Sequence, residues 1–238
     1  MTTAVIILSV ISALFAAFFI VIRVTKAPIY GLLTKTLASM VFVAMAGIGV
    51  YLGGNKMPDA TALIVAGLAF GMVGDIVLDL KRAHSEFEDL YLTSGMSAFT
   101  ADHSFVIAAT YLIAAPTIPN LWLPSVASAA IALAAAPVVM IVSLKIMKAN
   151  FGKHFAFSAF YAAFLIFFTV LSLWLSILDA KFVMLCVAMI LFLLSDLVLS
   201  TMYFVEGKKE DKLLVVVNHG LYYAAQILIA AWIFTLAM

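Results

Sequence analysis

Eight apolar stretches, each about 20 residues long, constrain the fold of this chain more than any other feature. They cover residues 4–22, 30–52, 60–79, 94–114, 121–144, 155–178, 181–204 and 213–237. A helix of this length crosses a hydrocarbon core, and the sequence lacks the alternation that is typical of a transmembrane barrel. Hydrophobic residues make up 66% of the 238 residues, and the mean hydropathy is +1.22. We therefore expect an all-α polytopic membrane protein, a bundle of eight transmembrane helices that forms a single domain over residues 1–238.

Basic residues in the short connections predict the orientation in the membrane. The connections after the first, third, fifth and seventh stretches contain Arg23, Lys26, Lys81, Arg82, Lys145, Lys148, Lys153, Lys208, Lys209 and Lys212. The connections at the opposite end contain only Lys56 and Lys181. Because cytoplasmic loops are enriched in Lys and Arg, we expect both termini on the non-cytoplasmic side. A bacterial inner membrane is the expected location.

Two further counts exclude other classes of protein. Cys186 is the only cysteine, so neither an intrachain disulfide nor a cysteine-clustered zinc site can form. The formal net charge of +1 gives no indication of a nucleic-acid partner. Membrane lipids are the expected surroundings, and the oligomeric state stays open.

Two carboxylates interrupt the apolar stretches. Asp75 lies in "GDIVLDL" and Asp196 in "FLLSDLVLS", so both share the pattern Asp-x-Val-Leu. A charge at mid-bilayer costs at least about 2.5–3.5 kcal/mol, which makes each one a candidate functional residue. Lys35, Asp75 and Asp196 fall within roughly 6–14 Å of the cytoplasmic boundary at 1.5 Å per residue. We expect one polar pocket in that half of the bundle.

Other polar residues lie at the same depth. They are Tyr161, His103, Asn218 and His219. Residues spaced four apart predict inward faces, which are formed by Gly95, Phe99 and His103 and by Asn218, Tyr222 and Gln226. Gly67, Gly71 and Gly74 permit close approach of a neighbouring helix, which places Asp75 in the interior.

Each of these residues also has a purely structural interpretation. Asp75 and Asp196 could form a buried ion pair or a polar clamp, yet one intramembrane lysine leaves a surplus acid. Two like charges in a low dielectric favour a protonated acid beside an ionised base, which is a catalytic arrangement. Lys35 either neutralises a carboxylate or holds a phosphate. His103 is either a packed side chain or a metal ligand.

Two more acidic residues are harder to place. Asp79 lies one turn closer to the cytoplasm than Asp75, so we expect it to be solvated or paired with a lysine. Asp102 points about 100° away from His103 and has no place in the predicted pocket.

Five segments resemble a known family, the YhhN-like lysoplasmalogenases. These segments are "LLTKTL", "GDIVLDL", "GMSAFTADH", "FLLSDLVLS" and "NHGLYYAAQILIA". They span the second to the eighth stretch in the order expected for this family of eight-helix membrane enzymes. The sequence departs from the family's pattern at two places. The segment "LLTKTL" lacks the proline that often follows the family's lysine, and Asp102 occupies a position where a small or apolar residue is usual.

The resemblance implies hydrolysis of the vinyl ether of a lysoplasmalogen, which releases a fatty aldehyde and a glycerophospho-base. Asp75 and Asp196 are then the catalytic acid and base, in an order that the sequence leaves open. The residues expected to bind the lysophospholipid are Lys35, His103, Tyr161, Ser195, Asn218, Tyr222, Gln226 and Asp79. The route requires no cofactor, and no metal is expected.

Two other functions are compatible with the same residues. A proton-coupled transporter of a small molecule or lipid also uses intramembrane Asp, Lys and His. A metal-dependent lipid hydrolase would take ligands from His103, His219, Asp75, Asp196 and Ser195. A regulatory membrane protein would leave the surplus acid without a role.

Overall fold

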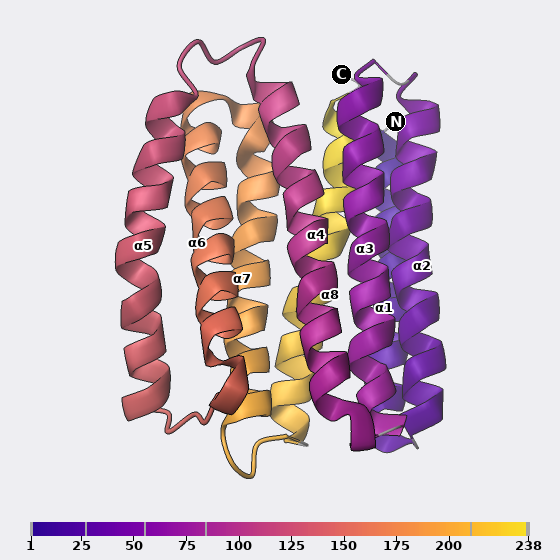
Figure 1. Ribbon diagram of the computed structural model, residues 1–238. Helices are drawn as coiled ribbons and strands as arrows, with labels where there is room; N and C mark the ends of the chain where they lie inside the picture. The colour runs from indigo at the N-terminus through magenta and orange to yellow at the C-terminus, as the bar shows by residue number, and fades with distance from the viewer. Residues whose placement is uncertain (1, 27, 55, 84, 210, 237–238) are drawn as a thin grey trace. The chain divides into compact units, whose positions relative to one another are not determined.

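The computed structural model describes residues 2–26, 28–54, 56–83, 85–209 and 211–236. These residues form eight α-helices and three short 3₁₀ helices, and no strand (Figure 1). The α-helices are α1 (Thr2–Thr25), α2 (Pro28–Leu52), α3 (Pro58–Ala83), α4 (Glu88–Ala114), α5 (Trp122–Lys145), α6 (Phe155–Leu178), α7 (Val183–Phe204) and α8 (Lys212–Thr235). The 3₁₀ helices are η1 (Ser85–Phe87), η2 (Gly152–His154) and η3 (Ala180–Phe182).

Each predicted apolar stretch corresponds to one α-helix, which confirms the all-α fold. The largest differences lie at the polar ends of helices. The helix α4 begins at Glu88, six residues before the predicted start, because Glu88 and Asp89 in its first turn interact favourably with the helix dipole. The last residue of the final predicted stretch, 237, lies outside the described residues.

Seven of the helices in the described part of the chain are long and apolar enough to cross a membrane, so the chain is a multi-pass integral membrane protein. The helix α4 is the exception, although its 27 residues are sufficient in length. It contains Glu88 and Asp89 at its start and Asp102 and His103 near its middle, which lower its hydropathy. Asp102 and His103 are fully buried, so protein rather than lipid surrounds them. An eighth crossing by α4 stays a prediction, as does the side on which the termini lie.

The chain forms two compact units, each of which we describe by itself. Unit 1 contains residues 1–116 and 226–238, and unit 2 contains residues 117–225. The division falls within α8, whose first half belongs to unit 2 and whose second half belongs to unit 1. The single domain predicted from the sequence stays a prediction.

Unit 1 is built from consecutive helices that pack on one another, α1 on α2, α2 on α3 and α3 on α4 (Figure 1). Large apolar side chains fill its interior, among them Phe19, Phe42, Ile64 and Trp232. The second half of α8 packs on α2, because a Cβ atom at Gly49 would lie 2.7 Å from the ring of Phe234. These contacts hold α2 and α3 side by side, and both carry predicted site residues.

Glycines bring α3 and α4 close together, so the neighbouring helix whose close approach the sequence predicts is α4. A Cβ atom at Gly67 would lie 2.8 Å from Val106, and one at Gly74 would lie 2.9 Å from the ring of Phe99. On α4, a Cβ at Gly95 would overlap the side chain of Leu78. Any larger residue at these positions would push the two helices apart.

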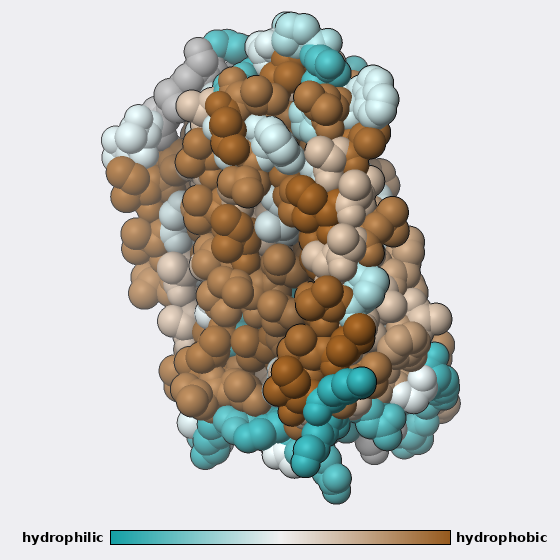
Figure 2. All heavy atoms as spheres, turned by 90° about the vertical axis from the view of Figure 1, so that its left-hand side faces the viewer, coloured by the Kyte–Doolittle hydropathy of each residue, from teal (hydrophilic) through white to brown (hydrophobic). Residues whose placement is uncertain are grey.

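In unit 2, α6 packs between α5 and α7 (Figure 1). Its core contains Leu165, Phe168, Leu185 and Phe192. Figure 2 shows the outer face of α5, where hydrophobic residues cover most of the height and hydrophilic residues gather at the two ends. Leu133 on that helix is 72% exposed, which is typical of a side chain that faces lipid tails rather than water.

Candidate functional site

The first cluster of polar residues joins α2 to α3 in unit 1. Lys35 and Ser39 are one turn apart on α2, so both reach the same carboxylate of α3. The ammonium of Lys35 lies 3.1 Å from Asp75 Oδ1, and the hydroxyl of Ser39 donates to Asp75 Oδ2 at 2.5 Å. All three side chains are buried. Lys35 therefore neutralises Asp75, one of the two roles predicted for it.

Asp79 also belongs to this buried region; of the two alternatives predicted for it, a solvated side chain and a side chain paired with a lysine, the structure shows the second. Only 5% of its surface is exposed. Its Oδ1 lies 3.9 Å from Arg23 Nε and 4.0 Å from the ammonium of Lys35. The expected pairing with a lysine is present, but a buried arginine from α1 contributes as well. The side chain lies inside the unit, where Arg23 of α1 and Lys35 of α2 both approach it.

Asp102 and His103 occupy the interior of unit 1, each with no exposed surface. The carboxylate of Asp102 lies against α3, where a Cβ atom at Gly71 would be 2.8 Å from its Oδ2. The amide of Gln226 donates to the same oxygen at 3.3 Å. The carboxylate of Asp102 therefore fits against α3 only because Gly71 has no side chain. This contact explains the position of Asp102, which the sequence pattern did not explain.

The second candidate carboxylate, Asp196, lies in unit 2 on α7. It accepts a hydrogen bond of 2.7 Å from the hydroxyl of Tyr161 on α6. Tyr161 is buried, whereas Asp196 is partly exposed. Asp75 thus faces a cation, and Asp196 faces a neutral phenol.

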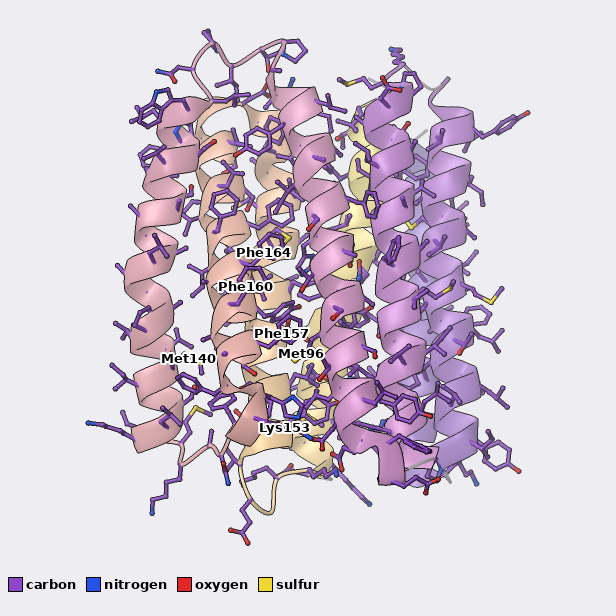
Figure 3. The ribbon with its side chains drawn as sticks, viewed as in Figure 1. Met96, Met140, Lys153, Phe157, Phe160 and Phe164 are labelled. Carbon is purple, nitrogen blue, oxygen red and sulfur yellow. The ribbon has the colours of Figure 1, made fainter. Side chains whose placement is uncertain are left out.

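Aromatic rings continue along α6 beside Tyr161. Phe157, Phe160 and Phe164 follow one another on this helix (Figure 3). The rings of Phe157 and Phe160 are stacked with centroids 6.4 Å apart, and those of Phe160 and Phe164 with centroids 6.0 Å apart. They form an apolar surface on the helix that supplies the partner of Asp196.

Ser195, Asn218 and His219 connect α7 to α8 within unit 2. The amide nitrogen of Asn218 donates to the backbone oxygen of Ser195 at 2.9 Å, which fixes the orientation of the amide. Its oxygen therefore faces His219 Nδ1, 2.6 Å away. Because an amide oxygen only accepts, Nδ1 of His219 carries the proton. Asn218 thus has a clear structural role in holding these two helices together.

The stripe predicted on α8 is buried along its whole length. Tyr222 packs edge-on against Phe192, with ring centroids 5.5 Å apart and an interplanar angle of 75°. Asn218 and Tyr222 belong to unit 2, whereas Gln226 belongs to unit 1.

The predicted site residues divide between the two units. Unit 1 contains Lys35, Asp75, Asp79, His103 and Gln226, and unit 2 contains Tyr161, Ser195, Asp196, Asn218 and Tyr222. Apart from Asp196, all are buried. The common cavity for Asp75 and Asp196 that the sequence predicts stays a prediction, and so does the role of each residue.

Sequence patterns missed three side chains near Asp75 and Asp79. Ser39 follows Lys35 by four residues, a spacing that places it on the same face of α2. Arg82 follows Asp79 by three residues, and Arg23 lies in the last turn of α1. The sequence predicts cytoplasmic loops for both arginines. Arg23 is only 8% exposed. The two arginines were missed because α1 and α3 continue beyond the apolar stretches that were used to predict them.

Among the residues that the structure describes, no group of three or more His, Cys, Asp or Glu side chains is arranged to hold a metal ion. The ligands considered for a metal-dependent hydrolase lie in both units.

Comparison with known proteins identifies the family. Neither the comparison with curated proteins nor that with solved structures found a match. The model of the YhhN family matches residues 30–233, a range that includes most of α2 to α8 and both Asp-x-Val-Leu segments. Since the match covers far more than half of the sequence, the chain belongs to the YhhN family.

Proposed function

We propose that this protein is a lysoplasmalogenase, a hydrolase that cleaves the vinyl ether bond of a lysoplasmalogen. The support is membership of the YhhN family, which includes lysoplasmalogenases. One structural observation supports the proposed acid–base chemistry: the region matched by the family model contains two carboxyl groups in different electrostatic environments. Asp75 lies beside an ammonium group, and Asp196 lies beside a phenol.

The reaction needs one acid and one base. Protonation of the β-carbon of the vinyl ether produces an oxocarbenium ion at the α-carbon. Water then adds to that carbon and loses a proton to the base. The hemiacetal then collapses: the protonated base gives its proton to the leaving glycerol oxygen, and the deprotonated acid takes the proton of the hemiacetal hydroxyl. This step releases a fatty aldehyde and glycerophosphoethanolamine or glycerophosphocholine. The sum of these steps consumes one water molecule and returns the acid and the base to their starting states.

The surroundings of the two carboxyl groups support one assignment of the acid and the base. An ammonium at 3.1 Å and a hydroxyl donor at 2.5 Å stabilise the ionised form of Asp75. We therefore assign Asp75 as the base that activates water and stabilises the cation. Asp196 accepts a hydrogen bond from the neutral hydroxyl of Tyr161, which stabilises the ionised form less than an ammonium does, so we assign Asp196 as the proton donor.

The remaining site residues position these two groups or the lipid. Lys35 and Ser39 hold the carboxylate of Asp75, and Tyr161 holds that of Asp196. The stacked rings of Phe157, Phe160 and Phe164 offer an apolar surface for the single hydrocarbon tail. His103, Ser195, Asn218, Tyr222 and Gln226 complete the proposed substrate-binding set. The route requires no cofactor.

Product analysis tests this proposal. Purified protein in detergent is given a lysoplasmalogen and an ester lysolipid side by side, and the products are identified by mass spectrometry. We expect a fatty aldehyde from the first substrate and slower or no release of fatty acid from the second. Activity that disappears with EDTA and returns with zinc would assign a metal-dependent hydrolase instead. Uptake of lipid into proteoliposomes without any cleavage would assign a transporter.

A further inference from the structure

A buried network of hydrogen bonds in unit 2 leads to His219, a residue that the proposed reaction does not use. Nδ2 of Asn218 on α8 donates to both the backbone oxygen and the hydroxyl of Ser195 on α7, at 2.9 Å each. The hydroxyl of Ser195 in turn donates to the backbone oxygen of Asn218 at 3.1 Å. Ser195, Asn218 and His219 are all buried. The amide of Asn218 is therefore held in one orientation.

The held amide determines which nitrogen of His219 carries the proton. Oδ1 of Asn218 lies 2.6 Å from Nδ1 of His219, and an amide oxygen only accepts, so Nδ1 is the donor. In a neutral ring with a protonated Nδ1, the other nitrogen, Nε2, bears the lone pair and accepts hydrogen bonds. A partner at Nδ1 also fixes the direction of the ring, as it does for histidines that act through Nε2.

The depth of His219 matches that of the proposed proton donor, Asp196. His219 follows Lys212, the first residue of α8, by seven residues, which is about 10 Å along the helix axis. Asp196 precedes Phe204, the last residue of α7, by eight residues, which is about 12 Å. The residues directly before them in the chain are hydrogen-bonded to each other, so the two levels meet. His219 thus lies at the level of the proposed chemistry in unit 2.

We propose that His219 is an additional substrate-binding residue, whose Nε2 accepts a hydrogen bond from the hydroxyl group on the middle carbon of the lysolipid's glycerol. The identification of this hydroxyl as the donor rests on the proposed function. At about 10 Å from the start of α8, His219 lies deeper than a headgroup, which stays at the membrane surface. Asn218 acts through His219 as a positioning residue.

The chemistry of the substrate agrees with this position. In a lysoplasmalogen, the vinyl ether oxygen and the hydroxyl are carried by adjacent carbons of glycerol. A lipid whose reactive bond lies at Asp196 therefore brings its hydroxyl to the level of His219. An intact plasmalogen carries an acyl ester on the same carbon and has no hydroxyl to donate. This hydrogen bond would thus contribute to selectivity for the lysolipid.

Binding of lipids that cannot be cleaved tests this inference without catalysis. Both probes are phosphocholine lysolipid analogues with a saturated alkyl ether; one carries the hydroxyl, and the other has hydrogen in its place. Choline has no N–H group, so only the hydroxyl can donate to Nε2. We expect the wild type to bind the hydroxyl probe roughly 2- to 10-fold more tightly, the range for one hydrogen bond.

The ratio of the two Kd values separates a lost hydrogen bond from general damage, which would raise both values together. In His219→Phe the two Kd values should become equal. The control is His154→Phe, the same replacement in η2 of the same unit, where the histidine ring lies 6.4 Å from that of Phe204. This variant should keep the wild-type ratio.

Nuclear magnetic resonance of the wild type keeps the test valid if His219→Phe folds poorly. Asn218 and His219 form the only Asn–His pair in the sequence, so ¹³C in asparagine and ¹⁵N in histidine identify the signals of His219. We expect a protonated Nδ1 and an Nε2 without a proton. The hydroxyl probe should shift the Nε2 resonance, and the probe without the hydroxyl should not.

The same spectrum tests the positioning role of Asn218. Asn218→Leu removes the acceptor at Nδ1, so we expect signals of the other tautomer, with a protonated Nε2, and a smaller ratio of the two Kd values. The sequence contains no Leu–His pair, so labelled leucine identifies His219 in this variant. An unchanged tautomer would show that Asn218 does not position the ring.

Three results would overturn the inference. They are equal Kd values for the two probes in the wild type, a wild-type ratio in folded His219→Phe, and an Nε2 resonance that only a phosphoethanolamine lipid without the hydroxyl shifts. Because the probes have no vinyl ether, the two proposals can fail separately. Hydroxyl-selective binding without release of aldehyde would support this inference against the lysoplasmalogenase proposal, and aldehyde release with equal Kd values would do the reverse.

Discussion

The ammonium of Lys35 lies 3.1 Å from a carboxylate oxygen of Asp75, and both side chains are buried in unit 1. Removal of the cation would leave a buried charge without its partner, which costs about 3–5 kcal/mol. We therefore expect Lys35→Met to lower the stability of the protein by that order. The double variant Lys35→Met/Asp75→Asn should recover much of the loss. Thermal unfolding of the purified variants measures both effects, and equal destabilisation of single and double variants would show that the pair is not coupled.

Substitution of either candidate catalytic carboxylate should abolish most of the activity. General acid–base groups typically contribute about 10²- to 10⁴-fold to a rate. Asp75→Asn and Asp196→Asn should therefore each lower the turnover of lysoplasmalogen by at least about 100-fold. The control is Asp179→Asn, which changes an acid in the connection between α6 and α7 and should leave turnover unchanged. Wild-type turnover in either site variant, measured as aldehyde released, would remove that carboxylate from the mechanism.

The contribution of Asp179 to the stability of the folded protein depends on pH. Partial burial of its carboxyl group raises the pKa, but hydrogen bonds and charge from Lys181 and a hydrogen bond from Thr117 lower it by more. The pKa of Asp179 in the folded protein is thus below the ordinary value of an aspartic acid. Because the folded state favours the ionised form, its stabilising effect is present above the unfolded pKa and is lost as the pH falls through the folded pKa.

Because the pKa of Asp179 is lowered in the folded protein, the stability of the wild type and of Asp179→Asn should be compared at two pH values. The wild type should be more stable than Asp179→Asn at pH 7, and the difference should shrink at pH 3. Melting temperatures of the two proteins at both pH values provide the measurement. A difference that grows on acidification would show that the carboxylate does not stabilise the fold in this way.

Close packing of α3 on α4 makes Gly95 sensitive to the smallest substitution. A Cβ atom there would overlap the side chain of Leu78. Overpacking of this kind costs typically about 1–3 kcal/mol, so Gly95→Ala should lower the unfolding temperature. Gly220→Ala on α8 should not, since no described atom lies within 4 Å of its added Cβ. Identical unfolding temperatures of the two variants would mean that α3 and α4 can move apart at Gly95 without a loss of stability.

Apolar length and spacing were sufficient to predict the helices and several of the buried contacts. The stretches of about 20 residues correspond to the helices, and Gly67 and Gly74 correctly predicted the close approach of a neighbouring helix, which the structure identifies as α4. Lys35 and Asp75 were placed at one depth and do form a pair. These features depend on the spacing of residues within one helix, which can be read from the sequence alone.

The ends of the helices could not be predicted in the same way. Arg23 and Asp79 look like loop and boundary residues, because hydropathy falls before a helix ends. The structure extends α1 and α3 further and buries both side chains, which lie 3.9 Å apart. Likewise, the place of Asp102 depends on Gly71, a residue on another helix, and only tertiary packing reveals that relationship.

Proton transfer to carbon is the step that most directly tests the central claim, that acid–base catalysis cleaves a vinyl ether. The measurement is hydrolysis of a lysoplasmalogen in deuterium oxide by the purified wild type, with the aldehyde trapped immediately and its mass determined. The account predicts one deuterium on the carbon next to the aldehyde group, and a slower reaction than in ordinary water. It also predicts that Asp196→Asn, which lacks the proton donor, forms little of this product. Aldehyde without deuterium at that carbon, or no aldehyde at all from protein that binds the lipid, would contradict the account.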